Sequence, residues 1–266
     1  MKPTTMTRID PIPSNLSPDA LIRSLGITEP RDIDVEAIAY YVGLKVKRRC
    51  LNCCEAMITG RGNKGIISVK PGVMPQRERF SIAHELGHWA HHRGETVACR
   101  ATDIGRFSKT NEVERAADQY AANLLMPYAM FKSACREHRR LDLKALKAVS
   151  GAFNTSLTAT LIRMIDTGNY PNAIMINHGT GGRKWHKLAN GIPGYWKPKD
   201  DLDADSFAFE LLHNPTSRDE GFPRKIGADA WFDNWAAEKY EITEQSFRIP
   251  GEGVITILNL DGNMIS

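Results

Sequence analysis

The sequence predicts an α+β protein in which a mainly helical domain with a small β-sheet is followed by a second α+β domain. Residues 19–168 hold segments with apolar side chains at helical spacing, around one glycine-broken pattern that is typical of a β-hairpin. Residues 169–266 hold mostly short strand-like segments and one helical segment. Gly168 and Pro171 mark the boundary between the two domains. Residues 1–18, with several Pro, Thr and Ser, are expected to be flexible.

The spacing of apolar residues, together with the glycines and prolines that interrupt it, predicts the helices and strands of the first domain. A helix with apolar Val35, Ile38 and Val42 on one face is stopped by Gly43. The further predicted elements are a strand at 44–47, a hairpin at 56–72, a helix from about 76 to 92 and a helix at 111–126 that ends before Pro127.

Residues 141–168 predict two short helices that resemble a helix-turn-helix in outline. Ser156 or Thr155 would cap the second helix, and Gly168 would end it. A helix that reads DNA normally presents several basic or amide side chains, whereas this one offers a single base, Arg163. We therefore favour a packing role over a DNA-reading role, and the DNA-reading alternative stays open.

In the second domain, one helical segment lies among strand-like segments. Alternating or continuous apolar residues bounded by Gly, Pro, Asn and Asp predict the strands. The strand-like segments are 173–177, 227–232, 245–249 and 253–260, and the helical segment is 203–214.

Composition narrows the classes of protein. Hydrophobic residues make up 42% and charged residues 25% of the chain, as in ordinary globular proteins. No apolar run approaches the roughly 18 residues of a membrane span, so we expect a cytoplasmic protein with no membrane partner. Five cysteines, an odd and unevenly spaced set, argue against a disulfide framework. The net charge of +4 combines a basic excess before residue 170 with an acidic excess after it, which permits an acidic partner for the first part.

The segment RFSIAHELGHWAHH contains a His-Glu-x-x-His pattern within a predicted helix. His84 and His88 are four residues apart, so their rings lie on one face, about 6 Å apart along the axis. Two imidazoles in this arrangement can bind one zinc ion. Glu85 lies about 100° around the helix from His84, where it can reach a water on the metal without binding the metal itself. The pattern therefore predicts one zinc ion per chain, with Glu85 as the general base.

A third ligand is expected from the segment NEVERAADQYAANLLMP. Glu114 and Asp118 lie on or beside the apolar stripe of this helix, where a carboxylate is costly unless it is paired or bound to metal. Glu114 as ligand and Asp118 as hydrogen-bond acceptor for a zinc-bound histidine would satisfy both. Two alternatives remain: Glu112 as the ligand, or Glu114 as the third residue of a capping box with Asn111.

These two segments together resemble the ImmA/IrrE family of gluzincin-like zinc metallopeptidases. In that family an RF-x-x-AHELGH helix precedes an E-x-x-A-[ND]-x-[FY]-A-x-x-LLMP helix, and the resemblance covers about residues 30–165. It implies a zincin-like first domain with zinc held by His84, His88 and Glu114, and Glu85 as base. It also implies a GAF-like sensor domain at the C-terminal end, and a partner helix-turn-helix repressor as the substrate, which is cleaved or inactivated after DNA damage or another stress.

Cys99 lies eleven residues after His88, between the two ligand helices. A thiolate is a good zinc ligand and could fill the fourth position in a resting, inhibited state. The alternative is a free cysteine with no role in the site. Together with the long C-terminal extension, Cys99 also resembles the members of the family that are proposed to relieve a repressor in anti-phage defence operons.

The segment RKWHKLANGIPGYWKPK mixes basic and aromatic residues and contains no acid. Phosphate contacts beside stacked bases are how proteins hold single-stranded nucleic acid. The candidate residues for such a patch, with single-stranded DNA as a possible activator, are Arg183, Lys184, Trp185, Lys187, Trp196 and Lys197. The alternatives are a basic loop with Trp185 and Trp196 anchored in the core, or a site for a small ligand.

The sequence thus predicts a zinc endopeptidase that cleaves a specific helix-turn-helix repressor and so de-represses an operon. The alternative from another class is a regulator without proteolytic activity, which would use the zinc fold as a scaffold to bind DNA or the repressor. The sequence favours the enzyme because a scaffold needs His84 and His88 but has no use for Glu85.

Overall fold

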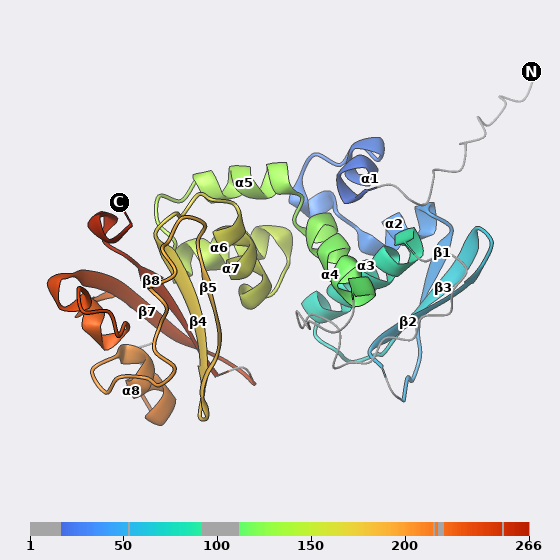
Figure 1. Cartoon of the computed structure of the whole chain (residues 1–266). Helices are drawn as coiled ribbons and strands as arrows, with labels where there is room; N and C mark the ends of the chain where they lie inside the picture. The colour runs from blue at the N-terminus through green and yellow to red at the C-terminus, as the bar shows by residue number, and fades with distance from the viewer. Residues whose placement is uncertain are drawn as a thin grey trace, which may run out of the picture. The chain divides into compact units, whose positions relative to one another are not determined.

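The computed structural model of the chain describes residues 17–52, 54–91, 112–214, 216–217, 221–251 and 253–265 (Figure 1). Contacts between Cα atoms divide the chain into two compact units. The first comprises residues 1–130 and 152–155, and the second comprises residues 131–151 and 156–266. The described residues form eight α-helices and two β-sheets, so the predicted α+β class is confirmed.

The first unit contains four helices and a three-stranded sheet. Its helices are α1 (Pro18–Ser24), α2 (Val35–Tyr41), α3 (Pro75–His91) and α4 (Glu112–Leu125), and a short 3₁₀ turn spans Pro30–Asp32. Its strands are β1 (Leu44–Arg48), β2 (Ala56–Arg61) and β3 (Lys64–Val69), in the order β1-β3-β2. β1 runs parallel to β3, and β2 pairs with β3 as an antiparallel hairpin.

Local chemistry explains these elements. The Asp34 side chain caps α2 by accepting the backbone N–H groups of Glu36 at 2.9 Å and Ala37 at 3.1 Å. Gly62 adopts a φ of 62° in the turn between β2 and β3, a conformation that glycine reaches without steric cost. The predicted helix, strand and hairpin of this region are therefore confirmed.

Helices α3 and α4 pack together and carry the candidate site. The apolar stripe expected on α4 is buried: Ala117, Ala121, Leu124 and Leu125 are each at most 2% exposed. On α3, the run from Ser81 to Trp89 is buried throughout. Polar side chains of the site thus lie inside the helical core of the unit, where water has little access.

The second unit is built on a five-stranded antiparallel sheet. Its strands are β4 (Ala173–Gly179), β5 (Gly182–Leu188), β6 (Arg224–Gly227), β7 (Glu241–Ile249) and β8 (Gly253–Asn259), in the order β5-β4-β8-β7-β6. Its helices are α6 (Leu143–Phe153), α7 (Leu157–Asp166) and α8 (Phe207–His213). The division between the units falls within α5 (Tyr128–Arg136) and before the last two residues of α6. Short 3₁₀ turns lie at Ala228–Ala230, Ala237–Lys239 and Gly262–Met264.

Both faces of this sheet are covered. The Leu143 N–H at the start of α6 donates to Gln245 Oε1 on β7 at 2.8 Å. The preceding residue of β7, Glu244, accepts the N–H groups of Phe207 and Ala208 at the start of α8. Because neighbouring side chains of a strand point to opposite faces, α6 and α8 lie on opposite sides of the sheet. The second unit thus combines helices with a sheet, as the α+β class requires, while the bounds of a second domain and its GAF-like fold stay predictions.

Several expectations change in the second unit. The predicted strand at 227–232 is wrong for most of its length, because β6 ends at Gly227 and a 3₁₀ turn follows. Strand β5 and helix α5 were not expected. The pair of helices at 141–168 exists, and Leu146, Val149 and Leu161 of α6 and α7 are at most 2% exposed, which supports packing. The contact division falls at residue 130, whereas the sequence places the domain boundary at 168.

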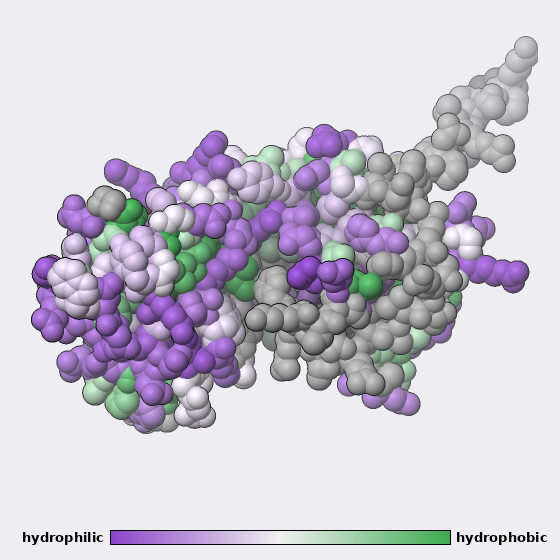
Figure 2. Space-filling view, in the orientation of Figure 1, coloured by the Kyte–Doolittle hydropathy of each residue, from purple (hydrophilic) through white to green (hydrophobic). Residues whose placement is uncertain are grey.

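The hydropathy of the visible surface and the length of the helices bear on whether the chain could enter a membrane. On the face in Figure 2, most described side chains of the second unit are hydrophilic. No helix in the described part of the chain is both long and apolar enough to cross a membrane.

Candidate metal centre

Helix α3 carries the two histidines and the glutamate of the His-Glu-x-x-His pattern into the interior of the first unit. His84 and Glu85 are fully buried, and His88 is 1% exposed. The rings of His84 and His88 lie on one side of the helix, with their centroids 4.7 Å apart. Their Nε2 atoms are 3.0 Å apart, so both nitrogens point into one small region.

Helix α4 brings two carboxylates to this region. Oε2 of Glu114 lies 3.2 Å from Nε2 of His84, and Oε1 lies 3.5 Å from Nε2 of His88. One turn later, Oδ1 of Asp118 accepts a hydrogen bond from Nδ1 of His84 at 2.9 Å. This bond makes Nδ1 the donor and leaves Nε2 of His84 directed at Glu114 and His88.

The donor set fits a divalent metal ion. His84, His88 and Glu114 each offer one ligand atom, and these atoms all lie within 4.8 Å of one another. Two imidazole nitrogens and one carboxylate oxygen form a donor set of catalytic zinc sites, which keep a further position open. The hydrogen bond from His84 to Asp118 is also of the kind that orients a metal-binding imidazole.

The electrostatics of the site favour a cation. Burial would lower the pKa of His84, but hydrogen bonds to Asp118 and Glu114, with the charge of Glu85 nearby, outweigh it and raise the pKa to about 9. Hydrogen bonds to His84 and His88 hold the pKa of Glu114 well below its usual range, although burial opposes them. Carboxylates surrounding imidazole nitrogens thus attract positive charge, either a proton or a metal ion.

Glu85 lies next to the donor set without belonging to it. It neighbours His84 in the sequence, and the group of three ligand atoms does not include it. Its carboxylate is fully buried on a helix, about 100° around the axis from His84. Glu85 is therefore not one of the three grouped ligands, and its role as the general base stays a prediction.

The structure bears on the alternatives that the sequence left open for the third ligand. Glu112, the competing ligand, is exposed at the start of α4, whereas Glu114 faces both histidines. Asn111, the partner in the alternative capping box, lies outside the described residues. Cys99 also lies outside them, so its place relative to the histidines is not described.

The residues of the predicted basic patch have diverse surroundings in the second unit. Arg183 donates to the Pro198 carbonyl oxygen and pairs with Asp200, and Lys187 pairs with Asp166 at 2.7 Å. Trp196 is 2% exposed and Trp185 is half-buried, whereas Lys184 and Lys197 are exposed. The structure thus brings Trp196 into the core, as the anchored-loop alternative expected.

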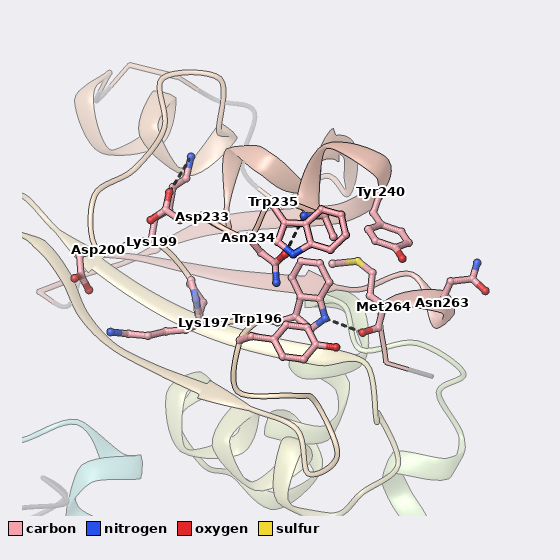
Figure 3. Close-up of a pocket in the computed structure, with 13 residues that line it drawn as sticks. Trp196, Lys197, Lys199, Asp200, Asp233, Asn234, Trp235, Tyr240, Asn263 and Met264 are labelled. Carbon is pink, nitrogen blue, oxygen red and sulfur yellow. Dashed lines mark hydrogen bonds and ion pairs between the residues drawn. The ribbon is translucent and has the colours of Figure 1, made fainter.

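An open groove of about 940 Å³ nevertheless lies beside the patch (Figure 3). Lys197 and Lys199 line it together with two aromatic residues that are largely exposed, Tyr195 at 61% and Trp235 at 82%. The buried indole of Trp196 forms part of its wall and donates to the Met264 carbonyl oxygen at 2.7 Å. Asp200 and Asp233 also line the groove, so its charge is mixed.

Sequence reasoning missed Trp235, although its setting carried a signal. The segment DNWAAEK surrounds one tryptophan with polar and small residues, which favours an exposed indole. Nζ of Lys239 lies 4.5 Å from the centroid of this ring. Sequence reasoning also gave no role to Gly87, which lies between the two histidines on α3.

Comparison with known proteins yields one family match and one structure of similar fold. Residues 47–164 match the model of the Peptidase_M78 family, described as the IrrE N-terminal-like domain. Among solved structures, the chain is similar to a Mycobacterium tuberculosis transcriptional regulator, with 12% identity, a TM-score of 0.52, and coverage of 92% of this chain and 86% of that chain. At this identity the likeness shows a shared fold and nothing further. No curated protein matches the chain.

Proposed function

We propose that the part of the chain around residues 47–164, which match the model of the IrrE N-terminal-like domain of the Peptidase_M78 family, is a zinc-dependent endopeptidase. The observation that carries the proposal is the convergence of His84, His88 and Glu114, whose ligand atoms lie within 4.8 Å of one another. Asp118 orients His84 from behind, and the buried Glu85 lies beside the three.

The chemistry divides between the metal and the chain. Zinc bound by His84, His88 and Glu114 would polarise the scissile carbonyl and make water a better nucleophile at neutral pH. Glu85 accepts the proton that the attacking water loses, and then donates it to the nitrogen of the leaving amine. Asp118 holds the His84 ring in one tautomer and orientation throughout.

The substrate that we propose is a helix-turn-helix transcriptional repressor, whose cleavage would de-repress an operon. The family resemblance of the HELGH and LLMP helices supports this choice. The solved structure described as a transcriptional regulator shares the fold and does not by itself extend the argument to a substrate. We propose a stress signal such as DNA damage as the trigger, with anti-phage defence as one setting.

The test is incubation of the purified chain with a helix-turn-helix repressor, chosen from a gene beside its own if one is found there. Glu85→Gln should lower the rate of repressor cleavage by roughly 10²–10⁴-fold, since it removes the general base, while zinc content stays at one ion per chain. Glu112→Gln is the matched control, because Glu112 is exposed on α4 and lies outside the donor set. An intact repressor under every activating condition would instead support the scaffold function, in which the zinc fold only binds the repressor or DNA.

Cys99 is proposed as an inhibitory fourth zinc ligand, on the chemistry of its thiolate and its position between the ligand helices in the sequence. Cys99→Ser should then raise repressor cleavage in the absence of any activator. Equal cleavage by the variant and the parent chain would eliminate this role.

Single-stranded DNA is proposed as the activator, held by the second unit. The exposed side chains of Lys197, Tyr195 and Trp235 around one groove support this proposal, because cations and stacking rings suit a flexible polyanion. Trp235→Ala should weaken binding of single-stranded DNA, by roughly 1–3 kcal/mol per lost stacking contact. Phe222→Ala removes another exposed ring, 63% exposed and outside the groove, and should change nothing. Absence of binding even at low salt would remove DNA as the activator and leave a small ligand as the alternative.

A further inference from the structure

Helices α3 and α4 of the candidate metal centre lie in close contact at a glycine of α3, Gly87. A Cβ atom built on Gly87 of α3 would lie 2.9 Å from Cα and 3.1 Å from the carbonyl oxygen of Ala117 on α4. It would also lie 3.1 Å from Cβ of Tyr120. Two of these three atoms belong to the backbone, so no rotation of a side chain can relieve the contact.

The contact between Gly87 and Ala117 lies next to the residues of the proposed site on both helices. On α3, Gly87 follows His84 by three residues and directly precedes His88. On α4, Ala117 follows Glu114 by three residues and directly precedes Asp118. The distances of 3.2 and 3.5 Å from Glu114 to the histidines, and of 2.9 Å from Asp118 to His84, therefore depend on how closely the two helices approach here.

We infer that Gly87 is a positioning residue of the metal site: its missing side chain lets α4 come close enough for Glu114 to join His84 and His88 around one ion. The inference rests on the proposed zinc function and explains how the chain brings the third ligand to the first two. It gives the glycine of HELGH a role in metal binding that differs from any effect on the helix itself.

A methyl group at Gly87 is expected to disturb zinc binding strongly, because the shift that it requires exceeds what zinc–ligand distances tolerate. Ordinary contacts between carbon atoms lie at about 3.5–4.0 Å, so a methyl group at Gly87 requires α4 to shift by roughly half an ångström or more. Zinc sites tolerate deviations of only about 0.2 Å in ligand distance. Helix propensity predicts the opposite sign, because alanine stabilises the interior of a helix relative to glycine. The two effects can therefore be told apart in one variant.

The experiment measures zinc affinity by competition with a chromogenic chelator, and the visible spectrum of the cobalt-substituted full-length protein. Gly87→Ala should bind zinc about 10–100-fold more weakly, the range seen when groups that orient metal ligands are altered, and should change the cobalt ligand-field bands. Gly151→Ala is the matched control. Gly151 also lies inside a helix, α6, with an ordinary φ and no atom within 4 Å of its Cβ position. This variant should keep both the zinc affinity and the cobalt spectrum.

The outcomes separate this inference from the proposed function. Zinc affinity and a cobalt spectrum like those of the parent chain would overturn the role of Gly87, whatever the chain cleaves. Circular dichroism with and without saturating zinc covers the case of poor folding, since a variant unfolded in both conditions would assign Gly87 to general packing and also overturn the inference. Weakened zinc binding by Gly87→Ala in a chain that never cleaves a repressor would sustain the positioning role while the peptidase proposal fails.

Discussion

Both units of the molecule hold buried or half-buried carboxylates, but they surround them in opposite ways. In the first unit, Glu114 and Asp118 face the imidazole nitrogens of His84 and His88, which are themselves metal-binding groups. In the second unit, Glu244 on β7 is 1% exposed and is enclosed by four hydrogen-bond donors of the chain itself.

The partners of Glu244 make it a structural group. One oxygen accepts the Ala208 N–H and the Ser246 hydroxyl, both at 2.8 Å. The other accepts the Phe207 N–H at 3.3 Å and the Trp231 indole N–H at 3.0 Å. A buried charge that the chain saturates in this way fixes packing, whereas carboxylates set against imidazoles create a place for an added cation. Buried Glu244 thus fixes packing in the second unit, whereas Glu114 and Asp118 of the first unit are arranged for the metal site that we propose.

Metal removal is the strongest test of the difference between the two units, because we expect it to change the unfolding free energy of the first unit more than any other change below. A ligand present at about 1,000 times its dissociation constant stabilises a fold by about 4 kcal/mol, so chelation should lower the unfolding free energy of the first unit by up to this amount. The second unit should be unaffected. Hydrogen exchange resolved by peptide measures both, with α3 and α4 reporting on the first unit and β7 and β8 on the second.

Removal of a single ligand is the control for metal removal. His88→Ala should abolish the dependence of the α3 and α4 exchange rates on chelator. Faster exchange in β7 and β8 on chelation would mean that the metal also supports the second unit, and the division of roles would fail.

The next largest effect is expected for Glu244→Ala. The change leaves several buried donors without an acceptor, and each unsatisfied buried group costs about 1–3 kcal/mol, so we expect a loss of roughly 3 kcal/mol or more from the second unit. Zinc affinity should stay unchanged. Glu241→Ala is the matched control, because Glu241 is exposed on the same strand, and such surface changes usually stay within about 0.5 kcal/mol. A Glu244→Ala protein as stable as the parent chain in urea would show that the network is not structural.

The difference between the units also explains which parts could be predicted from the sequence. The spacing of His84 and His88 fixes their relation because a helix repeats every 3.6 residues, and the apolar stripe of α4 pointed Glu114 inward. Both signals are local. Glu244 gives no such signal, because its partner Trp231 lies 13 residues away and Ala208 lies 36 residues away. A contact of that kind exists only once the strands have paired.

The elements that the sequence did not predict have similar causes. Helix α5 begins at Tyr128, directly after Pro127, and proline is as well suited to precede a helix as to end one. Strand β5 has the sequence GRKWHKL, with no β-branched residue, and lies at an edge of its sheet. Pairing with β4, rather than its own composition, makes it a strand. The close contact of Gly87 with Ala117 likewise depends on tertiary packing, so the glycine in the sequence does not by itself reveal which helix packs against it.

The smallest expected effect is the pH dependence of the stability of the second unit, which tests whether a buried histidine there contributes to stability rather than to a binding site. His178 on β4 is fully buried, with its ring centroid 5.8 Å from that of Trp231. Burial and the charge of Arg183 lower the pKa of His178 to about 4, although Asp200 and Asp201 oppose this shift. In the unfolded chain the pKa of a histidine is about 6.5. The folded unit therefore binds this proton more weakly than the unfolded chain does.

The sign of the effect follows from that difference. Above about pH 6.5 the ring is neutral in both states and the stability of the second unit is complete. As the pH falls from about 6.5 to about 4, the unfolded chain takes up the proton first, and the unit loses at most roughly 3.5 kcal/mol. His178→Gln should flatten this part of the profile of unfolding free energy against pH, measured by exchange in β4 and β8, while His213→Gln, at an exposed position on α8, should leave it unchanged. A profile as steep in His178→Gln as in the parent chain would assign the acid sensitivity to other groups. In that case the protonation of buried His178 would not control the stability of the second unit. The contrast between the two units would then rest on the hydrogen-bonded carboxylate of Glu244 alone.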